Sequence, residues 1–314
     1  MAVVLRPFLD QDAGAVLAIA NAVIPYDLEG NEHWLRQRRQ FNAIRFQRWH
    51  YVALERETQQ AIGYGAIEQG QPRERFRLFL LATPEHLRAG VGQRLYEQLM
   101  SDLDASGAHT VWMRENQRDQ SLVALMREWG FVQTQLLWDA RLSLAQTPLA
   151  PLLPVVEQVA ARGIIIDTVM EERRRNPRLA ACLHELYNIA QSDVYQPIDF
   201  ETFLQRLEEP GIVPHGFFLA RQGDEYLGLS VLARVEGVPE QAQQFWTGVR
   251  PLFRRQGIAT ALRICTIEAA QRLGYRTLVT YTDHADPIML ALNEKLGFHR
   301  WFGYVTLEKT LTSS

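Results

Sequence analysis

The chain has 314 residues, of which 47% are hydrophobic, so it is long and apolar enough for two domains with a core each. Its 33 basic and 36 acidic residues leave a net charge of -3, which argues against a dedicated nucleic-acid or membrane-surface protein. Two isolated cysteines, Cys182 and Cys265, exclude a disulfide framework and a cysteine zinc site, and we expect no metal. Because no stretch resembles a leader or a membrane span, we expect a cytoplasmic protein.

The first half of the chain alternates short strands and helices. In chain order we expect a strand over 3–7, helices over 11–23 and 32–40, strands over 49–55, 61–68 and 75–82, a helix over 89–104, a strand over 110–113, a helix over 121–129 and closing strands over 131–142. Val91, Leu95, Leu99 and Leu103 lie four apart and predict one buried helix face.

The second half shows the same order of elements. We expect a strand over 164–170, helices over 177–191 and 200–207, strands over 217–221, 226–235 and 243–249, a helix over 257–273, a strand over 277–281, a helix over 287–296 and a final strand pair over 298–307. This order predicts an α+β fold, with a mixed sheet whose parallel pair flanks the central helix of each half.

The two halves are also related residue by residue. An offset of 167, the separation of Gly90 and Gly257, carries the segment 84–131 onto 251–298 without a gap and matches prolines, glycines and helix-face leucines together. A unit of this size is too large for a stacked repeat, so the chain contains a duplicated domain. Three prolines in 147–163 mark the seam, and we expect an N-terminal domain over 1–147, a linker helix over 148–162 and a C-terminal domain over 163–314.

The segment Thr247–Leu262, TGVRPLFRRQGIATAL, joins a strand to a helix through a glycine turn. A helix that starts at such a turn presents unpaired N–H groups, and the glycine lets a ligand approach the backbone closely. This arrangement is typical of a phosphate or pyrophosphate site. Four arginines, at positions 250, 254, 255 and 263, lie in a stretch without Asp or Glu and should favour an anionic ligand further.

These residues resemble a known family. Arg254-x-x-Gly257-x-Ala259 is similar to the acyl-CoA pyrophosphate signature of the GNAT acyltransferase superfamily, and Gly248-Val249-x-Pro251 and Leu296-Gly297-Phe298 match the same family pattern in the same order. The resemblance covers most of the chain, twice over, and is of the tandem two-domain bacterial type. It implies in each half a six- to seven-stranded mixed sheet, splayed between its fourth and fifth strands, with acetyl-CoA in the wedge.

The resemblance also implies which residues hold acetyl-CoA. The N–H groups of residues 256–260 would bind the pyrophosphate, and the strand 247–249 would bind the pantetheine arm. Asp286 holds a position that often contacts CoA, although Asp-Pro before a helix is also a plain cap. The implied cofactor-binding residues are Thr247, Gly248, Val249, Arg254, Arg255, Gln256, Gly257, Ile258, Ala259, Thr260 and Asp286.

The first half carries an equivalent loop, with Leu87 where the family has Arg or Gln. Its candidate cofactor-binding residues are Arg88, Ala89, Gly90, Val91 and Gly92. Because this loop has fewer basic residues and Glu85 beside it, the C-terminal half is the better acyl-CoA site. Two interpretations stay open for the N-terminal half: a second cofactor site, or a degenerate copy retained for packing.

The catalytic residues are less evident. The resemblance implies that the Val249 N–H polarises the thioester carbonyl, whereas the family's tyrosine acid is replaced by Asn293 and Met126, and its frequent glutamate base by Gln243, with Glu240 the nearest carboxylate. Tyr281, Tyr304 and His284 lie near strand ends beside the wedge and are candidates for the missing acid. Each could instead fill or rim the core.

The function that the resemblance implies is transfer of an acetyl group from acetyl-CoA to an amine of a small-molecule acceptor. A different class of function, a non-catalytic acyl-CoA binding or sensing protein, also fits a chain with a phosphate loop but no evident acid or base. We expect a small-molecule partner and neither nucleic acid nor membrane, in a monomer or a homodimer.

Overall fold

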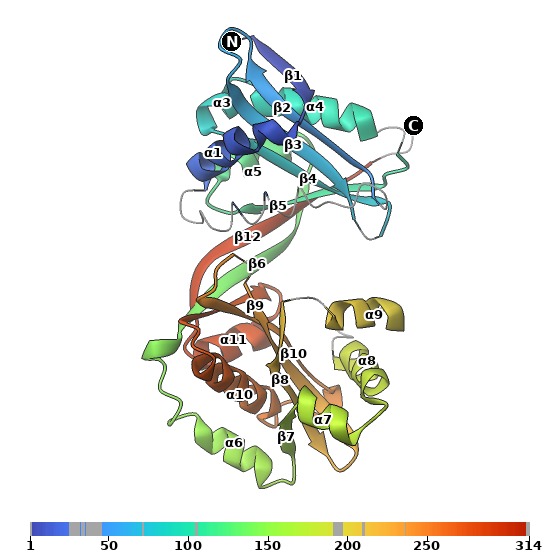
Figure 1. Ribbon diagram of the computed structural model, residues 1–314, viewed down its shortest axis with the longest axis vertical. Coiled ribbons are helices and arrows are strands. Elements are labelled where there is room, and N and C mark those ends of the chain that lie inside the picture. The colour runs from blue at the N-terminus through green and yellow to red at the C-terminus, as the bar shows by residue number, and fades with distance from the viewer. Residues whose placement is uncertain are drawn as a thin grey trace. The chain divides into compact units, whose positions relative to one another are not determined.

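The computed structural model describes residues 2–24, 32, 35, 46–70, 72–103, 106–190, 197–208, 211–235 and 237–311, so most of the helix expected over 32–40 lies outside the described residues. The chain folds into two compact units (Figure 1). Unit 1 comprises Met1–Leu137 and Phe302–Ser314, and unit 2 comprises Trp138–Trp301. Among the described residues, no helix combines the length and apolar character that crossing a bilayer requires.

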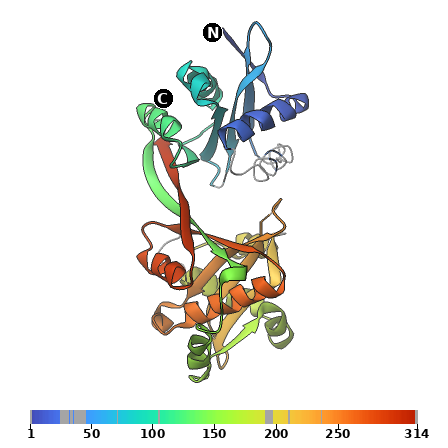
Figure 2. The same cartoon turned by 90° about the vertical axis from the view of Figure 1, so that its left-hand side faces the viewer.

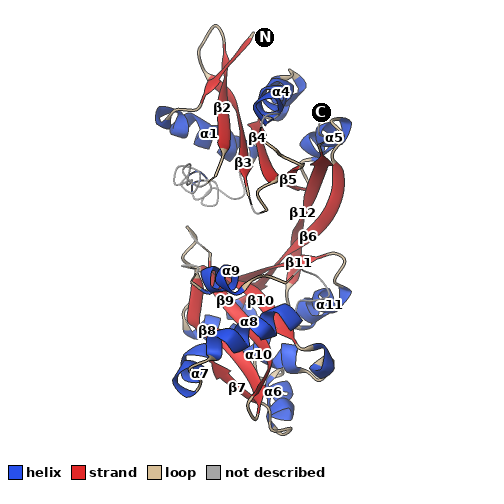
Figure 3. Cartoon of the chain, turned by 90° about the vertical axis from the view of Figure 1, so that its right-hand side faces the viewer, coloured by secondary structure: helices blue, strands red, loops and turns tan. Residues whose placement is uncertain are grey.

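Unit 1 has a mixed sheet with helices on both faces. Its strands follow the order β1 (Val3–Pro7), β2 (Arg48–Glu55), β3 (Ala61–Gln69), β4 (Arg75–Ala82), β5 (Thr110–Asn116) and β12 (His299–Thr310). The helices are α1 (Ala13–Val23), α3 (Pro84–Arg88), α4 (Val91–Leu103) and α5 (Gln120–Glu128), and α1 and α4 cover opposite faces (Figure 3). The predicted face of α4 is confirmed, since Val91, Leu95, Leu99 and Leu103 are all buried.

Unit 2 follows the same plan. Its strands follow the order β6 (Val132–Ser143), β11 (Thr277–Asp283), β10 (Gln241–Val249), β9 (Glu225–Arg234), β8 (Ile212–Gln222) and β7 (Ile165–Thr168). The helices are α6 (Leu153–Ala160), α7 (Val169–Arg175), α8 (Leu179–Ala190), α9 (Phe200–Leu207), α10 (Ile258–Arg272) and α11 (Pro287–Lys295). Figure 1 shows α10 and α11 on one side of this sheet and α8 and α9 on the other.

Several local predictions are corrected by the structure. The helix expected over 89–104 begins only at Val91, after Gly90 with a φ of +83°, and it is preceded by the short helix α3, which was not expected. The helix expected over 11–23 opens with a 3-10 turn at Asp10–Asp12, and the strand expected over 164–170 ends at Thr168, whose side chain caps α7. In each case a local side-chain or backbone hydrogen bond moves the boundary by a few residues.

The closing strands differ most from expectation, because each is one long strand where shorter ones were expected. β12 pairs antiparallel with β5 of unit 1, from Tyr304 opposite Asn116 to Thr310 opposite Thr110, and β6 continues into unit 2 as the neighbour of β11 (Figure 2). Each compact unit therefore completes its sheet with a strand from the other half of the sequence. We keep 1–147 and 163–314 as the proposed limits of the duplicated halves, with 148–162, which contains α6, as the linker.

Candidate active site

The parallel strands of unit 2 separate partway along their length. β10 and β11 pair only from Gln241 opposite Thr277 to Gln243 opposite Val279, although both strands continue beyond that point. A register shift between Gln244 and Trp246 marks a β-bulge in β10 where the separation begins. We call residues 244–249 of β10 and 280–283 of β11, which no longer pair with each other, the splayed segment.

The splay leaves backbone groups of β10 without a neighbouring strand. The Arg250 N–H donates to Leu227 O on β9 at 2.8 Å, and successive N–H groups of a strand point to opposite edges. The N–H groups of Val249 and Thr247 therefore point away from β9, toward the edge where pairing with β11 has ended. This edge can hydrogen-bond an extended amide chain, and it places the Val249 N–H where a carbonyl oxygen could accept from it.

The loop after β10 ends at a glycine that begins a helix. Gly257 has φ +81° and is the N-cap of α10, and Arg255 also has a positive φ of 64°. A Cβ on Gly257 would lie 3.4 Å from Val155 Cγ1 of α6, so the glycine serves both the left-handed turn and close packing. The first N–H groups of α10, at Ile258, Ala259 and Thr260, lack helical acceptors and are available to an anion.

The arginines around this loop are arranged differently from the expected ring of four charges. Arg250 pairs with Glu185 at 2.8 Å, and Arg254 donates to Val249 O at 3.1 Å. Arg263 is 1% exposed and points into the interior between α10 and α11. Arg255 is exposed at the turn. The direction of a side chain on a helix depends on its position in the 3.6-residue repeat. Arginines that are close in sequence can therefore point in different directions.

One further cation near the loop was missed by the sequence reasoning. Arg162, which follows α6, donates through Nη2 to Gln256 O and through Nη1 to Gln256 Oε1. The sequence did not indicate this contact, because Arg162 is far from Gln256 in the chain. The two residues meet through the tertiary packing of α6 on α10, with Val155 and Val159 beside Gly257. Arg162 thus joins Arg255 as an exposed cationic side chain at the loop.

Asp286 acts as a helix cap. Its Oδ1 accepts the Met289 N–H at 2.9 Å, and Pro287 occupies the first turn of α11. This confirms the capping role that Asp-Pro predicts, and contact of Asp286 with CoA stays a prediction. Asp119 caps α5 in the same manner in unit 1, through the Leu122 N–H at 3.0 Å.

The three candidates for the missing acid lie in different places. Tyr281 is 43% exposed and lies in the splayed segment of β11, on the face opposite Thr280 and Thr282. His284 follows β11 and accepts a hydrogen bond from Trp138 Nε1 at its Nδ1, 3.3 Å away, so its basic nitrogen is engaged when the ring is neutral. Tyr304 lies in unit 1, on β12 opposite Asn116, whereas Val249 and Tyr281 belong to unit 2, and a role for Tyr304 in catalysis stays a prediction.

Neither position expected for a base holds one in the splayed segment. Gln243 is the last β10 residue paired with β11, and Glu240 precedes β10 and forms an ion pair with Arg276 at 3.4 Å. Asn293, at the position of the family's tyrosine, is 2% exposed and hydrogen-bonded on both sides, to Arg263 and to Thr282. At the position of the family's tyrosine, this protein therefore has the middle residue of a buried hydrogen-bonded chain, Arg263–Asn293–Thr282.

Unit 1 shares the splay but differs in detail. β4 and β5 pair only from Arg75 opposite Thr110 to Arg77 opposite Trp112, yet β4 keeps a regular register with β3 and has no bulge. Its loop, with Arg88, Ala89, Val91 and Gly92 around Gly90, has the same left-handed turn before α4. On β5, Glu115 lies beyond the part of the strand that pairs with β4, and opposite Val305 of β12.

Glu115 carries a perturbed carboxyl group. Desolvation, together with Asp119, raises the pKa of Glu115 to about 8 from its usual 4.5, so the folded state favours the neutral acid. The wild-type free energy of unfolding should fall as the pH rises through this window, because the unfolded chain ionises first. We expect Glu115→Gln to unfold like wild type at about pH 4 and to be more stable by roughly 1–3 kcal/mol at about pH 9. Urea unfolding at both pH values measures this difference, and an equal offset at both would contradict it.

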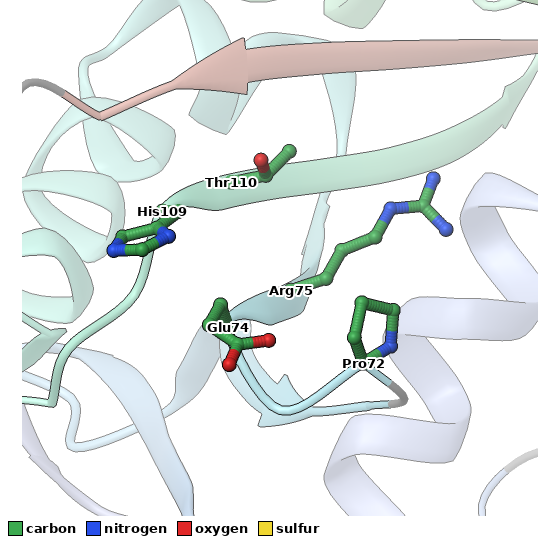
Figure 4. A pocket seen from close by; sticks show the side chains of 5 residues that line it. All are labelled: Pro72, Glu74, Arg75, His109 and Thr110. Carbon is green, nitrogen blue, oxygen red and sulfur yellow. The ribbon is translucent and has the colours of Figure 1, made fainter.

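A cavity in unit 1 lies at the other end of the same strands. It has a volume of about 320 Å³ and is lined by Pro72, Glu74, Arg75, His109 and Thr110 (Figure 4). Arg75 and Thr110 form the first pair of β4 and β5, so the cavity lies at their paired ends and away from the splay. It is therefore separate from the helix start at Gly90.

Comparisons with known proteins agree with this geometry. The model of the acetyltransferase (GNAT) family matches the chain twice, over residues 17–131 and 181–298. A mycothiol acetyltransferase of Thermobifida fusca is 25% identical over 317 residues, covering 93% of this chain and 92% of the relative, and one of Pseudarthrobacter chlorophenolicus is 26% identical over 250 residues, covering 78% and 73%.

Solved structures show the same fold. A GCN5-related N-acetyltransferase from Sphaerobacter thermophilus has a TM-score of 0.72 at 19% identity and covers 98% of this chain and 95% of that one. A tandem GNAT protein from the clavulanic acid biosynthesis pathway has a TM-score of 0.71 at 16% identity, with full coverage of both chains. With the family's domain matched in both halves, the chain belongs to the acetyltransferase (GNAT) family and is a tandem-domain, acetyl-CoA-dependent N-acetyltransferase.

Proposed function

We propose that unit 2 carries the acetyl transfer, with a small-molecule amine as acceptor. The observation that supports this most directly is the pairing of two features in one loop: a strand edge whose Val249 and Thr247 N–H groups have lost their neighbour, and a helix start at the left-handed Gly257. The first fits the pantetheine amides and the thioester, and the second fits the pyrophosphate. Residues 256–260 would hold the pyrophosphate, with Arg162 and Arg255 supplying charge.

The reaction needs few groups from the protein. The unprotonated acceptor nitrogen attacks the thioester carbonyl carbon, a C–N bond forms, and the C–S bond breaks with its electron pair on sulfur. The Val249 N–H donates to the carbonyl oxygen as it gains charge, which is worth most in a site shielded from water. The proton on nitrogen leaves to solvent, and Tyr281, on the face of β11 away from α11, is the proposed relay.

Several observations favour unit 2 over unit 1 for this role. Unit 1 lacks the β-bulge and has Glu115 in its splayed strand where unit 2 has Thr282. The buried Glu115 carboxyl group takes the place of the Thr282 hydroxyl group, which in unit 2 accepts a hydrogen bond from Asn293. We therefore propose that unit 1 is mainly structural and supplies β6 to the sheet of unit 2.

The acceptor is the finer part of the proposal. The relatives are named mycothiol acetyltransferases, which makes a small-molecule acceptor the first candidate for this chain. Release of CoA from acetyl-CoA, followed against a library of amino sugars, amino acids, polyamines and peptides, tests the proposal. Release that depends on one small amine supports it. Tight binding of acetyl-CoA with no release above hydrolysis would instead support a binding or sensing protein.

The proposed relay has a matched control within the chain. We expect Tyr281→Phe to lower kcat about 100-fold, because proton transfer by a positioned group contributes about that much, and to leave the KM for acetyl-CoA unchanged. Tyr304→Phe removes a tyrosine hydroxyl from β12 in unit 1 and should leave kcat unchanged, because we place the reaction in unit 2. Steady-state rates of both variants and of His284→Ala decide the matter. Equal kcat values in wild type and Tyr281→Phe would remove Tyr281 from the mechanism.

A further inference from the structure

The interior of unit 2 contains a buried guanidinium group, that of Arg263, with no carboxylate partner among the described residues. Arg263 is 1% exposed, and its Nη1 donates to Asn293 Oδ1 at 2.5 Å and lies 3.3 Å from Met289 Sδ. Its Nε and Nη2 are buried and have no hydrogen-bond partner among the described residues. These two nitrogens form one edge of the guanidinium, so a complete two-donor edge is left free.

The charge of Arg263 is not offset by a carboxylate of any described residue. Within the described part of the chain, no Asp or Glu side chain forms an ion pair with Arg263, and the ring of Phe298 is 5.1 Å away. Burial lowers the pKa of Arg263 to about 9, so the side chain is still a cation at neutral pH. A buried charge without a partner costs several kcal/mol of folding free energy in general. Such a charge is therefore unusual in a protein interior unless the site binds an anion during function.

The position of Arg263 relates it to the splayed segment. From α10 it reaches Asn293 on α11, and Asn293 Nδ2 donates to Thr282 Oγ1 on β11 at 2.8 Å. Thr282 lies three residues beyond Val279, the last β11 residue that pairs with β10. The chain Arg263–Asn293–Thr282 thus joins α10 to the part of β11 that no longer pairs with β10, and continuing the strand register past the bulge puts Thr282 near the level of Thr247.

Unit 1 shows that the fold does not require this charge. At the offset of 167, the equivalents of Arg263, Asn293 and Thr282 are Tyr96, Met126 and Glu115. Tyr96 stacks on Trp129 and Met126 is fully buried, so the same space is filled by packed rings and a thioether. In unit 1 the nearby cation is Lys309, whose Nζ donates to Tyr96 OH at 3.0 Å and to Trp129 O at 2.7 Å, whereas two guanidinium nitrogens of Arg263 have no such acceptor among the described residues.

We propose that Arg263 stabilises the thiolate that leaves from acetyl-CoA, with Asn293 as the residue that positions it. The inference rests on the proposed use of unit 2. When the C–S bond breaks, the electron pair stays on sulfur, and the free edge formed by Nε and Nη2 donates two hydrogen bonds to it. No proton is transferred in this step, so the position held by Asn293 needs no acid. The thiolate is protonated later by solvent.

The test measures the thiol of bound CoA directly. Titrating the ultraviolet absorbance of the thiolate in the CoA complex reports its pKa independently of turnover. In wild type we expect this pKa to lie about 1–2 units below that of free CoA, as a nearby cation requires. In Arg263→Met it should return to the free value, kcat should fall about 10–100-fold, and the KM for acetyl-CoA should change less than about threefold.

A second variant covers the case in which Arg263→Met fails to fold. Asn293→Asp places a carboxylate at the hydrogen bond to Nη1 and cancels the charge with a buried ion pair, so it should stay folded while raising the thiol pKa to the free value. Arg221→Met, which removes a partly buried arginine beside Glu172, is the matched control and should change neither quantity.

The outcomes separate the two proposals. Failure of CoA to bind at unit 2 would overturn the proposed function and this inference with it. Binding with a thiol pKa equal to that of free CoA, or a lowered pKa that neither Arg263→Met nor Asn293→Asp changes, would overturn the role of Arg263 alone. A lowered pKa that both variants raise supports it.

Discussion

We expect Gly257→Asp to weaken acetyl-CoA binding about 100-fold or more while the protein stays folded. The new carboxylate would lie at the N-terminus of α10, where it repels a pyrophosphate, and about 2.7 kcal/mol of repulsion corresponds to this factor. The same charge favours the helix itself, since Asp is a good residue at a helix start and tolerates a positive φ. Calorimetric titration with acetyl-CoA measures the loss, and thermal unfolding shows that the fold is intact.

Two controls separate charge from shape in this experiment. Gly257→Asn has the same size without the charge, and we expect it to lose less than about tenfold in affinity. Gly90→Asp introduces the same charge at the equivalent left-handed turn of unit 1, where φ is +83° and a Cβ has open space. We expect it to leave kcat/KM for acetyl-CoA within about threefold of wild type. Equal losses in the two Asp variants would show that the loop of unit 1 binds acetyl-CoA as well.

The second large effect concerns the amide that faces the splay. We expect Val249→Pro to lower kcat about 100- to 1,000-fold, because it removes the N–H proposed to donate to the carbonyl oxygen as charge develops there. The N–H does not face β9, so no hydrogen bond of the ladder is lost, and a proline is tolerated at such a position. Steady-state kinetics with saturating acetyl-CoA measures kcat, and acetyl-CoA affinity is measured separately.

Val249→Ala is the control for the lost side chain. Val249 is 6% exposed in the core beside Ile258 and Leu262, so its truncation costs about 1–2 kcal/mol of stability while the N–H is kept. We expect its kcat to match that of wild type. If Val249→Pro and Val249→Ala had the same kcat, the carbonyl would be polarised by another group, with the Thr247 N–H as the next candidate.

The chain shows how two copies of one fold can diverge inside. The outer features of the repeat agree between the units, including the left-handed glycines at 90 and 257 and the capping aspartates at 119 and 286. The interiors facing the splay differ, with packed Tyr96 and Met126 in unit 1 and the charged and polar chain through Arg263 in unit 2. Turns and caps are needed for the folding of both units. A buried cation destabilises the fold, so we attribute Arg263 to the function of unit 2.

The sequence by itself determined the features that depend on neighbouring residues. The glycine turn into α10, the Asp286 cap and the buried face of α4 follow from spacings of a few residues, because helix starts and helix faces are local properties of the backbone. The duplication was equally visible, since it needs only the comparison of the chain with itself. Together these features predicted an α+β order of elements and an anion-binding loop, and the resemblance to the GNAT superfamily added the splayed sheet and acetyl-CoA as the ligand.

Only the tertiary structure decided which distant residues meet. The exchange of β6 and β12 between the units, the contact of Arg162 with the loop at Gln256 and the burial of Arg263 against Asn293 all join residues far apart in the chain. Strand partners and ion pairs of this kind are selected by the packing of whole elements, and a one-dimensional pattern does not contain that choice. For the same reason, four arginines close together in sequence point in different directions, one of them into the core.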